Sequence, residues 1–102
     1  MRIISRRRLR EFWDDHPDAQ EPLKRWYLLT QKATWETPSD VTETFGSADL
    51  VKVESGNTVT VFNIGGNKYR LVAAVHYDYP RVFVLRVMTH KEYGTDKWKE
   101  EL

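Results

Sequence analysis

The sequence contains no cysteine among its 102 residues, which excludes disulfide bonds, thiolate nucleophiles and cysteine-bound zinc. It also lacks any apolar run near the ~18 residues that a membrane span requires. Residues 1–8 include four positive charges where a signal peptide would have its apolar region. We therefore expect a cytoplasmic protein, without a membrane partner, that is stabilised by packing alone.

Net charge is small as well: 16 basic and 15 acidic residues leave +1, which by itself does not indicate a polyanionic partner. The charges are unevenly distributed, however. Residues 64–91 contain five basic residues and one acidic residue, namely Lys68, Arg70, Arg81, Arg86 and Lys91 against Asp78. A local basic surface is therefore expected despite the nearly neutral total.

The apolar content supports a packed core, since 40% of the residues are hydrophobic and 13% are aromatic. A chain of this length is expected to form one domain over residues 1–102. Ser5 suits the N-cap of a first helix ending near Asp15, and residues 18–21 resemble a capping box for a second helix ending near Ala33. Residues 1–4 are compatible with a short strand, and residues 41–45 with a short helix after a turn at 37–40.

The second half of the sequence predicts strands at residues 50–54, 58–64, 68–77 and 81–88, separated by short turns. Short turns join antiparallel neighbours. Residues 89–92 match the capping box Thr-x-x-Glu, which predicts a short C-terminal helix through Tyr93 that is limited by Gly94. The expected fold class is α+β, with two N-terminal helices packed on a four-stranded, mainly antiparallel sheet.

Strand alternation predicts which side chains share a face of this sheet. Tyr69 and Leu71 should face the helices, together with Phe83, Leu85 and Val87 of the last strand. The opposite face should then be exposed. It would hold Arg70 and Arg86, with His90 at its end.

Two segments together resemble the core of HigB-type toxins, which belong to the RelE-like group. The first is Phe-Asn-Ile-Gly-Gly-Asn-Lys-Tyr-Arg-Leu-Val-Ala-Ala-Val at residues 62–75, and the second is Arg-Val-Met-Thr-His-Lys-Glu-Tyr at residues 86–93. The resemblance extends more loosely over the N-terminal helices and so covers nearly the whole chain.

This resemblance implies a RelE-like fold and an endoribonuclease that cuts mRNA, typically during translation on the ribosome. It implies a cognate HigA-type antitoxin with a helix-turn-helix domain, so that operator DNA is bound only through the toxin-antitoxin complex. It further implies chemistry without metal or cofactor. The ribose 2′-hydroxyl attacks the adjacent phosphate and leaves a 2′,3′-cyclic phosphate and a 5′-hydroxyl.

The residues in these segments suit such chemistry. Arg70, Lys68 and Lys91 could stabilise negative charge on the phosphate oxygens. His90 titrates nearest neutrality, but Lys91 competes with it for the proton-transfer role, because RelE itself relies mainly on lysine and arginine. Tyr93 would either stack on a base or act in proton transfer. Further RNA contacts are expected from Asn67 and Arg86.

Plainer interpretations exist for several features. Residues 65–67, Gly-Gly-Asn, most resemble a hairpin turn, and no three residues have metal-site spacing. His16 and His76 are expected to be structural or solvated. The run of arginines at residues 6–8 is either a solvated helix face or a contact for antitoxin or ribosomal RNA. We interpret Trp13, Trp26 and Trp35 as core or partner-contact residues.

Two other functions remain open at this point. A non-catalytic RNA- or antitoxin-binding domain could have the same fold, although the complete set of basic and tyrosine residues argues against it. A small metabolic enzyme would need a cofactor motif, and none is present.

Overall fold

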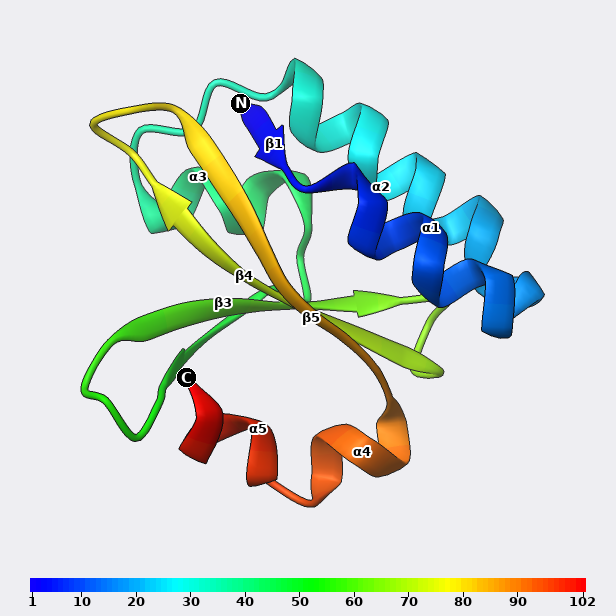
Figure 1. Ribbon diagram of the computed structural model, residues 1–102. Coiled ribbons are helices and arrows are strands. Elements are labelled where there is room, and N and C mark those ends of the chain that lie inside the picture. Colours follow the sequence, from blue (N-terminus) through cyan, green and yellow to red (C-terminus); the bar gives the residue numbers. More distant parts are fainter.

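Five strands pair into one mixed sheet in the order β1-β5-β4-β3-β2 (Figure 1). The computed structural model describes all residues from Met1 to Leu102. The strands are β1 (Arg2–Ile4), β2 (Asp49–Lys52), β3 (Thr58–Ile64), β4 (Tyr69–His76) and β5 (Arg81–Thr89). The α+β class is confirmed. The expected count of four strands is wrong, because β1 pairs in parallel with β5 and adds a fifth strand at the edge.

Three helices and a 3-10 turn precede β2 along the chain. They are α1 (Arg6–Asp15), η1 (Pro17–Ala19), α2 (Gln20–Lys32) and α3 (Pro38–Thr44). Ser5 occupies the N-cap of α1 as predicted, without a side-chain capping bond. The capping box expected at residues 18–21 is wrong, because η1 displaces the start of α2 and Ala19 stands at its N-cap. Thr37 and Asp40 form a capping box for α3 instead.

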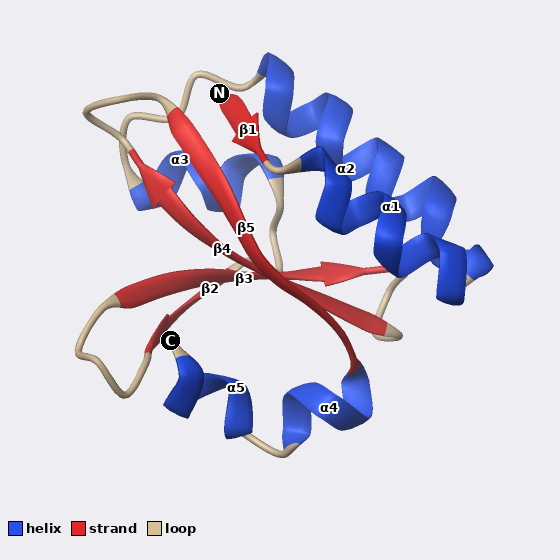
Figure 2. Ribbon diagram, in the orientation of Figure 1, coloured by secondary structure: helices blue, strands red, loops and turns tan.

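A first core lies between these helices and one face of the sheet, as Figure 2 shows for α1 and α2. Trp26 meets Phe62 edge to face, with ring centroids 5.4 Å apart. Trp26 and Trp35 are buried, which confirms their interpretation as core residues. Leu71 of β4 is fully buried beneath the helices.

The opposite sheet face is covered as well, so the prediction that it is exposed is wrong. Two short helices lie across it, α4 (His90–Gly94) and α5 (Lys97–Glu101) (Figures 1 and 2). Trp98 of α5 is 2% exposed and packs with Val72 and Met88 in a second core. Five residues are too few to show helical periodicity, and α5 therefore has no signature in the sequence.

A β-bulge in β5 reverses the alternation on which the face assignment depended. Val72 pairs with Arg86, but the next residue, Ala73, pairs with Val84, so Leu85 is left over. The extra residue turns every side chain before it to the other face. Val82 and Val84 accordingly lie in the helix-side core, and the assignment of Phe83 and Leu85 to that side is wrong.

Beyond the bulge, Arg86 and Met88 lie on the same face as Arg70 and Val72, because Arg70 pairs with Met88 and Val72 with Arg86. The predicted sharing of a face by Arg70 and Arg86 is thus confirmed.

No helix is both long and apolar enough to cross a membrane.

Replacing Leu71 by Ala should lower the free energy of unfolding by ~2 to 5 kcal/mol, because a fully buried leucine leaves a cavity in the helix-side core. Leu50→Ala on β2 is the matched control, since Leu50 is 51% exposed and its loss should cost less than about 0.5 kcal/mol. Urea denaturation of both variants measures the difference. Equal losses would contradict the assignment of Leu71 to the core.

Candidate active site

The turn between β3 and β4 and the end of β5 meet at one corner of the sheet. Tyr69 pairs with Thr89, and the backbone N–H of His90 donates to the carbonyl oxygen of Lys68 at 3.0 Å. Gly65 and Gly66 both have positive φ, +63° and +69°, which favours glycine at these positions of the turn. The predicted turn is confirmed, and the two segments that predicted the function lie side by side.

Arg70 is buried in this corner, with 8% of its surface exposed. Arg70 Nη2 donates a hydrogen bond to Asn67 Oδ1 at an N···O distance of 2.8 Å. Arg70 Nη1 donates to the carbonyl oxygens of Asn67 and Tyr69 at 3.2 and 3.1 Å. None of the three ion pairs in the structure includes Arg70. A guanidinium has five N–H donors, so two donors of Arg70 have no protein partner.

Tyr93 of α4 lies over this guanidinium, with Arg70 Cζ 5.5 Å from the ring centroid. Trp98 stacks on the same ring at 5.3 Å with an interplanar angle of 19°, and its Nε1 donates to the carbonyl oxygen of Tyr93 at 3.0 Å. The predicted capping box starts α4, because Glu92 N donates to Thr89 Oγ1 at 3.2 Å and Thr89 N to Glu92 Oε1 at 3.0 Å. The tyrosine is thus held from both its own helix and α5.

Asp18 is a member of this corner that the sequence analysis missed. Asp18 Oδ2 forms an ion pair with Lys68 Nζ at 3.1 Å, and Asp18 Oδ1 accepts a hydrogen bond from the Tyr69 hydroxyl. The hydrogen bond from Tyr69, followed by the ammonium of Lys68, lowers the pKa of Asp18, and the same bond raises the pKa of Tyr69. Only the tertiary structure joins residues 50 positions apart. The sequence pattern around Asp18 resembled a helix cap.

His16 lies next to this link, as a structural residue. Its ring stacks on Phe12 with centroids 4.3 Å apart and meets Tyr69 edge to face at 5.6 Å. These contacts agree with the structural interpretation of His16 and connect the end of α1 to the site.

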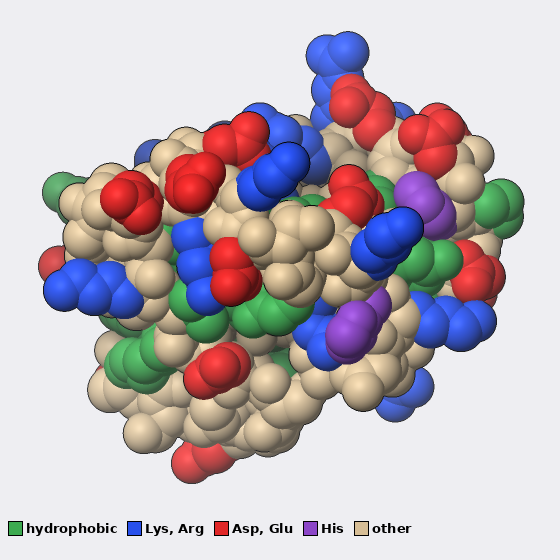
Figure 3. Space-filling view, turned by 90° about the horizontal axis from the view of Figure 1, so that it is seen from below, with side chains coloured by type: hydrophobic (Ala, Val, Ile, Leu, Met, Phe, Trp, Pro, Cys, Tyr) green, Lys and Arg blue, Asp and Glu red, His purple; other side chains and the backbone are tan.

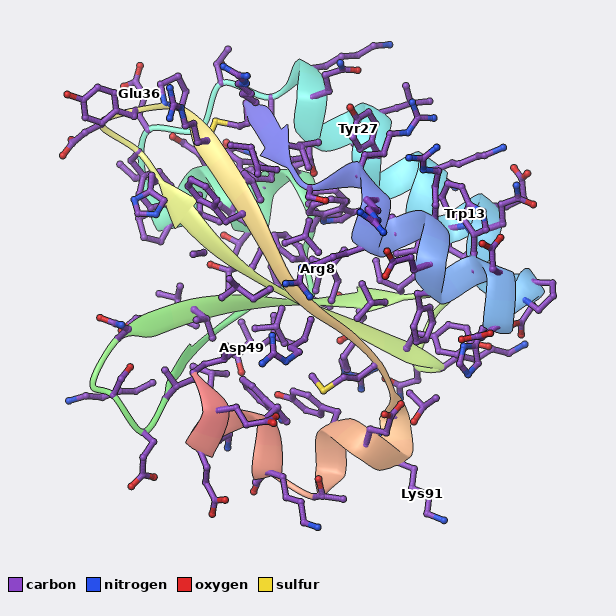
Figure 4. The ribbon with its side chains drawn as sticks, in the orientation of Figure 1. Arg8, Trp13, Tyr27, Glu36, Asp49 and Lys91 are labelled. Carbon is purple, nitrogen blue, oxygen red and sulfur yellow. The ribbon has the colours of Figure 1, made fainter.

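The remaining predicted residues are less tightly joined to Arg70. His90 and Lys91 are both exposed, and Lys91 projects away from the sheet below α4 (Figure 4). Arg86 is half-buried and donates to the carbonyl oxygen of Leu85 at 2.7 Å. Seen from the side of α4 and α5, histidine side chains lie beside lysine and arginine side chains on one half of the molecule (Figure 3).

The candidate residues belong neither to a metal-binding cluster nor to the cavity beside the β3–β4 turn. No group of three or more His, Cys, Asp or Glu residues is arranged to hold a metal ion. An open cavity of about 700 Å³ lies between α2, residues 44–47 and the β3–β4 turn, but none of the candidate residues lines it. What the corner does contain is the fixed positive charge of Arg70, which suits an anionic ligand.

Replacing Asp18 by Asn should lower the thermal midpoint at neutral pH, because the Lys68 ion pair is lost. The lowered pKa of Asp18 stabilises the fold above the unfolded carboxyl pKa of about 4, and this contribution disappears as the pH falls through the folded value. The difference between wild type and variant in pH-dependent thermal melts should therefore shrink in acid. Asp15→Asn, an exposed neighbour without an ion pair, is the control. A difference that stays constant with pH would argue against the link.

The model of the HigB toxin family, described as the RelE-like toxic component of a toxin-antitoxin system, matches residues 19–97. The chain is 30% identical over 93 residues to the mRNA interferase toxin HigB of Escherichia coli, which covers 91% of this chain and 88% of the relative. The mRNA interferase HigB of Shigella flexneri matches with the same identity and coverage. The resemblance found in the sequence is confirmed, and the chain belongs to the HigB family of RelE-like toxins, the toxic component of a toxin-antitoxin system.

Proposed function

We propose that this chain is an endoribonuclease that cleaves mRNA, the activity for which its HigB relatives are named. The observation that carries the proposal is the state of Arg70: buried, without a carboxylate partner, and fixed by Asn67 and Tyr93. Burying a cation whose N–H donors lack partners costs free energy unless a bound anion accepts from those donors. A phosphate of RNA is the anion that the site would receive.

The proposed reaction needs no metal. The ribose 2′-oxygen forms a bond to phosphorus and gives its proton to a base, while the bond from phosphorus to the 5′-oxygen breaks and that oxygen receives a proton. Negative charge grows on the non-bridging oxygens in the transition state. Because Arg70 is already oriented, it can stabilise this charge without reorganisation, and one such donor contributes about 3 kcal/mol in comparable sites.

We assign the proton transfer to His90 in preference to Lys91. The backbone N–H of His90 donates a hydrogen bond to the carbonyl oxygen of Lys68, which precedes Arg70 by two residues. The Lys91 side chain, in contrast, extends into solvent below α4 (Figure 4). A histidine side chain can also both accept and donate a proton, as general acid-base chemistry requires. Lys91 then contributes attraction for the RNA backbone.

Tyr93 and the remaining polar residues would position the RNA. Trp98 already stacks on the Tyr93 ring and Arg70 lies against it, so we assign its hydroxyl rather than an open ring face to the substrate. Asn67 orients Arg70, and Arg86 extends the positive charge along the same sheet face. Lys68 is ion-paired with Asp18, and its ammonium has further N–H donors for a phosphate.

The family assignment implies an antitoxin partner. We propose that this partner is of the HigA type, with a helix-turn-helix domain, so that operator DNA is contacted through it. We further propose that mRNA is cleaved in the cytoplasm during translation.

Arg70→Lys should lower kcat for RNA cleavage by ~10²- to 10³-fold, because it keeps the charge but loses the fork of donors held by Asn67. His90→Ala should lower it by ~10²- to 10⁴-fold, and Lys91→Ala much less. Cleavage in a purified translation reaction, with mapping of RNA ends, gives these values.

Lys97→Ala, on the exposed part of α5, is the control, and circular dichroism checks the fold. Equal activity of the wild type and the His90 variant would remove His90 from the mechanism. If the wild type binds RNA but leaves it intact, the chain is a non-catalytic binding domain.

Salt dependence tests the role of Lys68 separately. If this lysine binds a phosphate, Lys68→Ala should reduce the slope of log affinity against log salt concentration by ~0.7 for single-stranded RNA. Fluorescence anisotropy with a labelled oligoribonucleotide at several salt concentrations measures the slope. An unchanged slope would leave Lys68 with its ion pair to Asp18 as its only role.

A further inference from the structure

The helix layer contains a groove that the proposed RNA site does not use. It encloses about 410 Å³ between α1 and α2, on the opposite side of the sheet from α4 and α5 (Figure 1). Trp13 and Tyr27 lie on this layer, far from Lys91 (Figure 4). One stripe from each helix lines the groove: Arg6, Leu9 and Trp13 from α1, with Lys24, Tyr27, Leu28 and Gln31 from α2.

Both apolar and cationic side chains line the groove. Leu9 forms part of its wall, and Leu28, one of the few large apolar side chains that are exposed, has 54% of its surface in solvent. Arg6 lies over the Tyr27 ring at 5.2 Å, and Lys24 lies over the Trp13 ring at 5.7 Å. These aromatic contacts hold both cations at the groove.

The charges of the groove are not balanced. No carboxylate lines it, and neither Arg6 nor Lys24 belongs to any of the three ion pairs in the structure. A complementary segment would place apolar side chains against Leu28 and carboxylates against Arg6 and Lys24. An amphipathic acidic helix or strand has that composition.

We propose that this groove docks an acidic amphipathic segment of the antitoxin. The proposal rests on the assignment of the chain as a toxin and does not require RNA cleavage. RNA is the less suitable occupant, because cations already cover the aromatic rings on which bases would stack, and because Leu28 offers an aliphatic surface. A segment docked in this groove leaves the Arg70 corner uncovered. The groove would therefore add to the affinity for the antitoxin without itself blocking the RNA site.

The double variant Arg6→Glu/Lys24→Glu tests the proposal, with the purified antitoxin from the same locus as the probe. Its Kd for the antitoxin in calorimetry should rise on the order of 100-fold, since two attractive contacts become repulsive. Cells that express this variant should stop growing and should not be rescued by the antitoxin. Arg10→Glu/Lys32→Glu is the charge-matched control on the same two helices, outside the groove.

Leu28→Lys is a second variant that should keep the fold, since its side chain is already half in solvent. It should weaken antitoxin binding without slowing RNA cleavage. The proposal is overturned if both groove variants bind the antitoxin as tightly as wild type, or if they lose RNA cleavage while antitoxin binding is unchanged. An absence of RNA cleavage by the wild type would contradict the proposed function but not the docking site, because calorimetry measures binding alone.

Discussion

The pairing of β4 with β5 is the interaction on which the rest of the structure depends. Eight backbone pairs run from Tyr69 with Thr89 to His76 with Arg81. This ladder divides the interior into a helix-side core and a second core, and it places the β3–β4 turn beside the start of α4. Arg70 lies in the corner where these segments meet. The pairing of β4 with β5 therefore also determines the geometry of the site.

The second core links packing to electrostatics. Trp98 is inserted against Val72 and Met88, and from there it supports Tyr93 above Arg70. Burial of a guanidinium is unfavourable unless hydrogen bonds replace its hydration. Asn67 and two backbone carbonyls meet part of that need, and an anionic ligand would meet the remainder. The C-terminal helices thus keep a cation oriented in a partly desolvated position.

The two faces of the sheet have different surfaces. The face under α4 and α5 presents fixed positive charge at one corner, whereas the helix layer presents a groove in which cations rest on aromatic rings. Asp18 of η1 reaches Lys68 at this corner from the helix side, whereas no acidic residue lines the groove. Such a separation allows one surface to meet RNA and the other to meet a protein partner, with little competition between them.

Much of the architecture was determined by local sequence. The strand predicted at residues 58–64 and the helix ends predicted near Asp15 and Ala33 agree with β3, α1 and α2 almost to the residue, and the turn glycines and the Thr89–Glu92 box predict the corner. The paired segments at residues 62–75 and 86–93 also identify the family, because their residue types occur together.

Only the tertiary structure decided the rest. The bulge at Leu85 shifts the register by one residue and exchanges the two faces of β5, which no periodicity within the strand reveals. The parallel pairing of β1, the packing of α5 and the link from Asp18 to Lys68 and Tyr69 all join residues far apart along the chain. Their stability comes from burial and hydrogen bonding between distant segments, and that is why local sequence could not predict them.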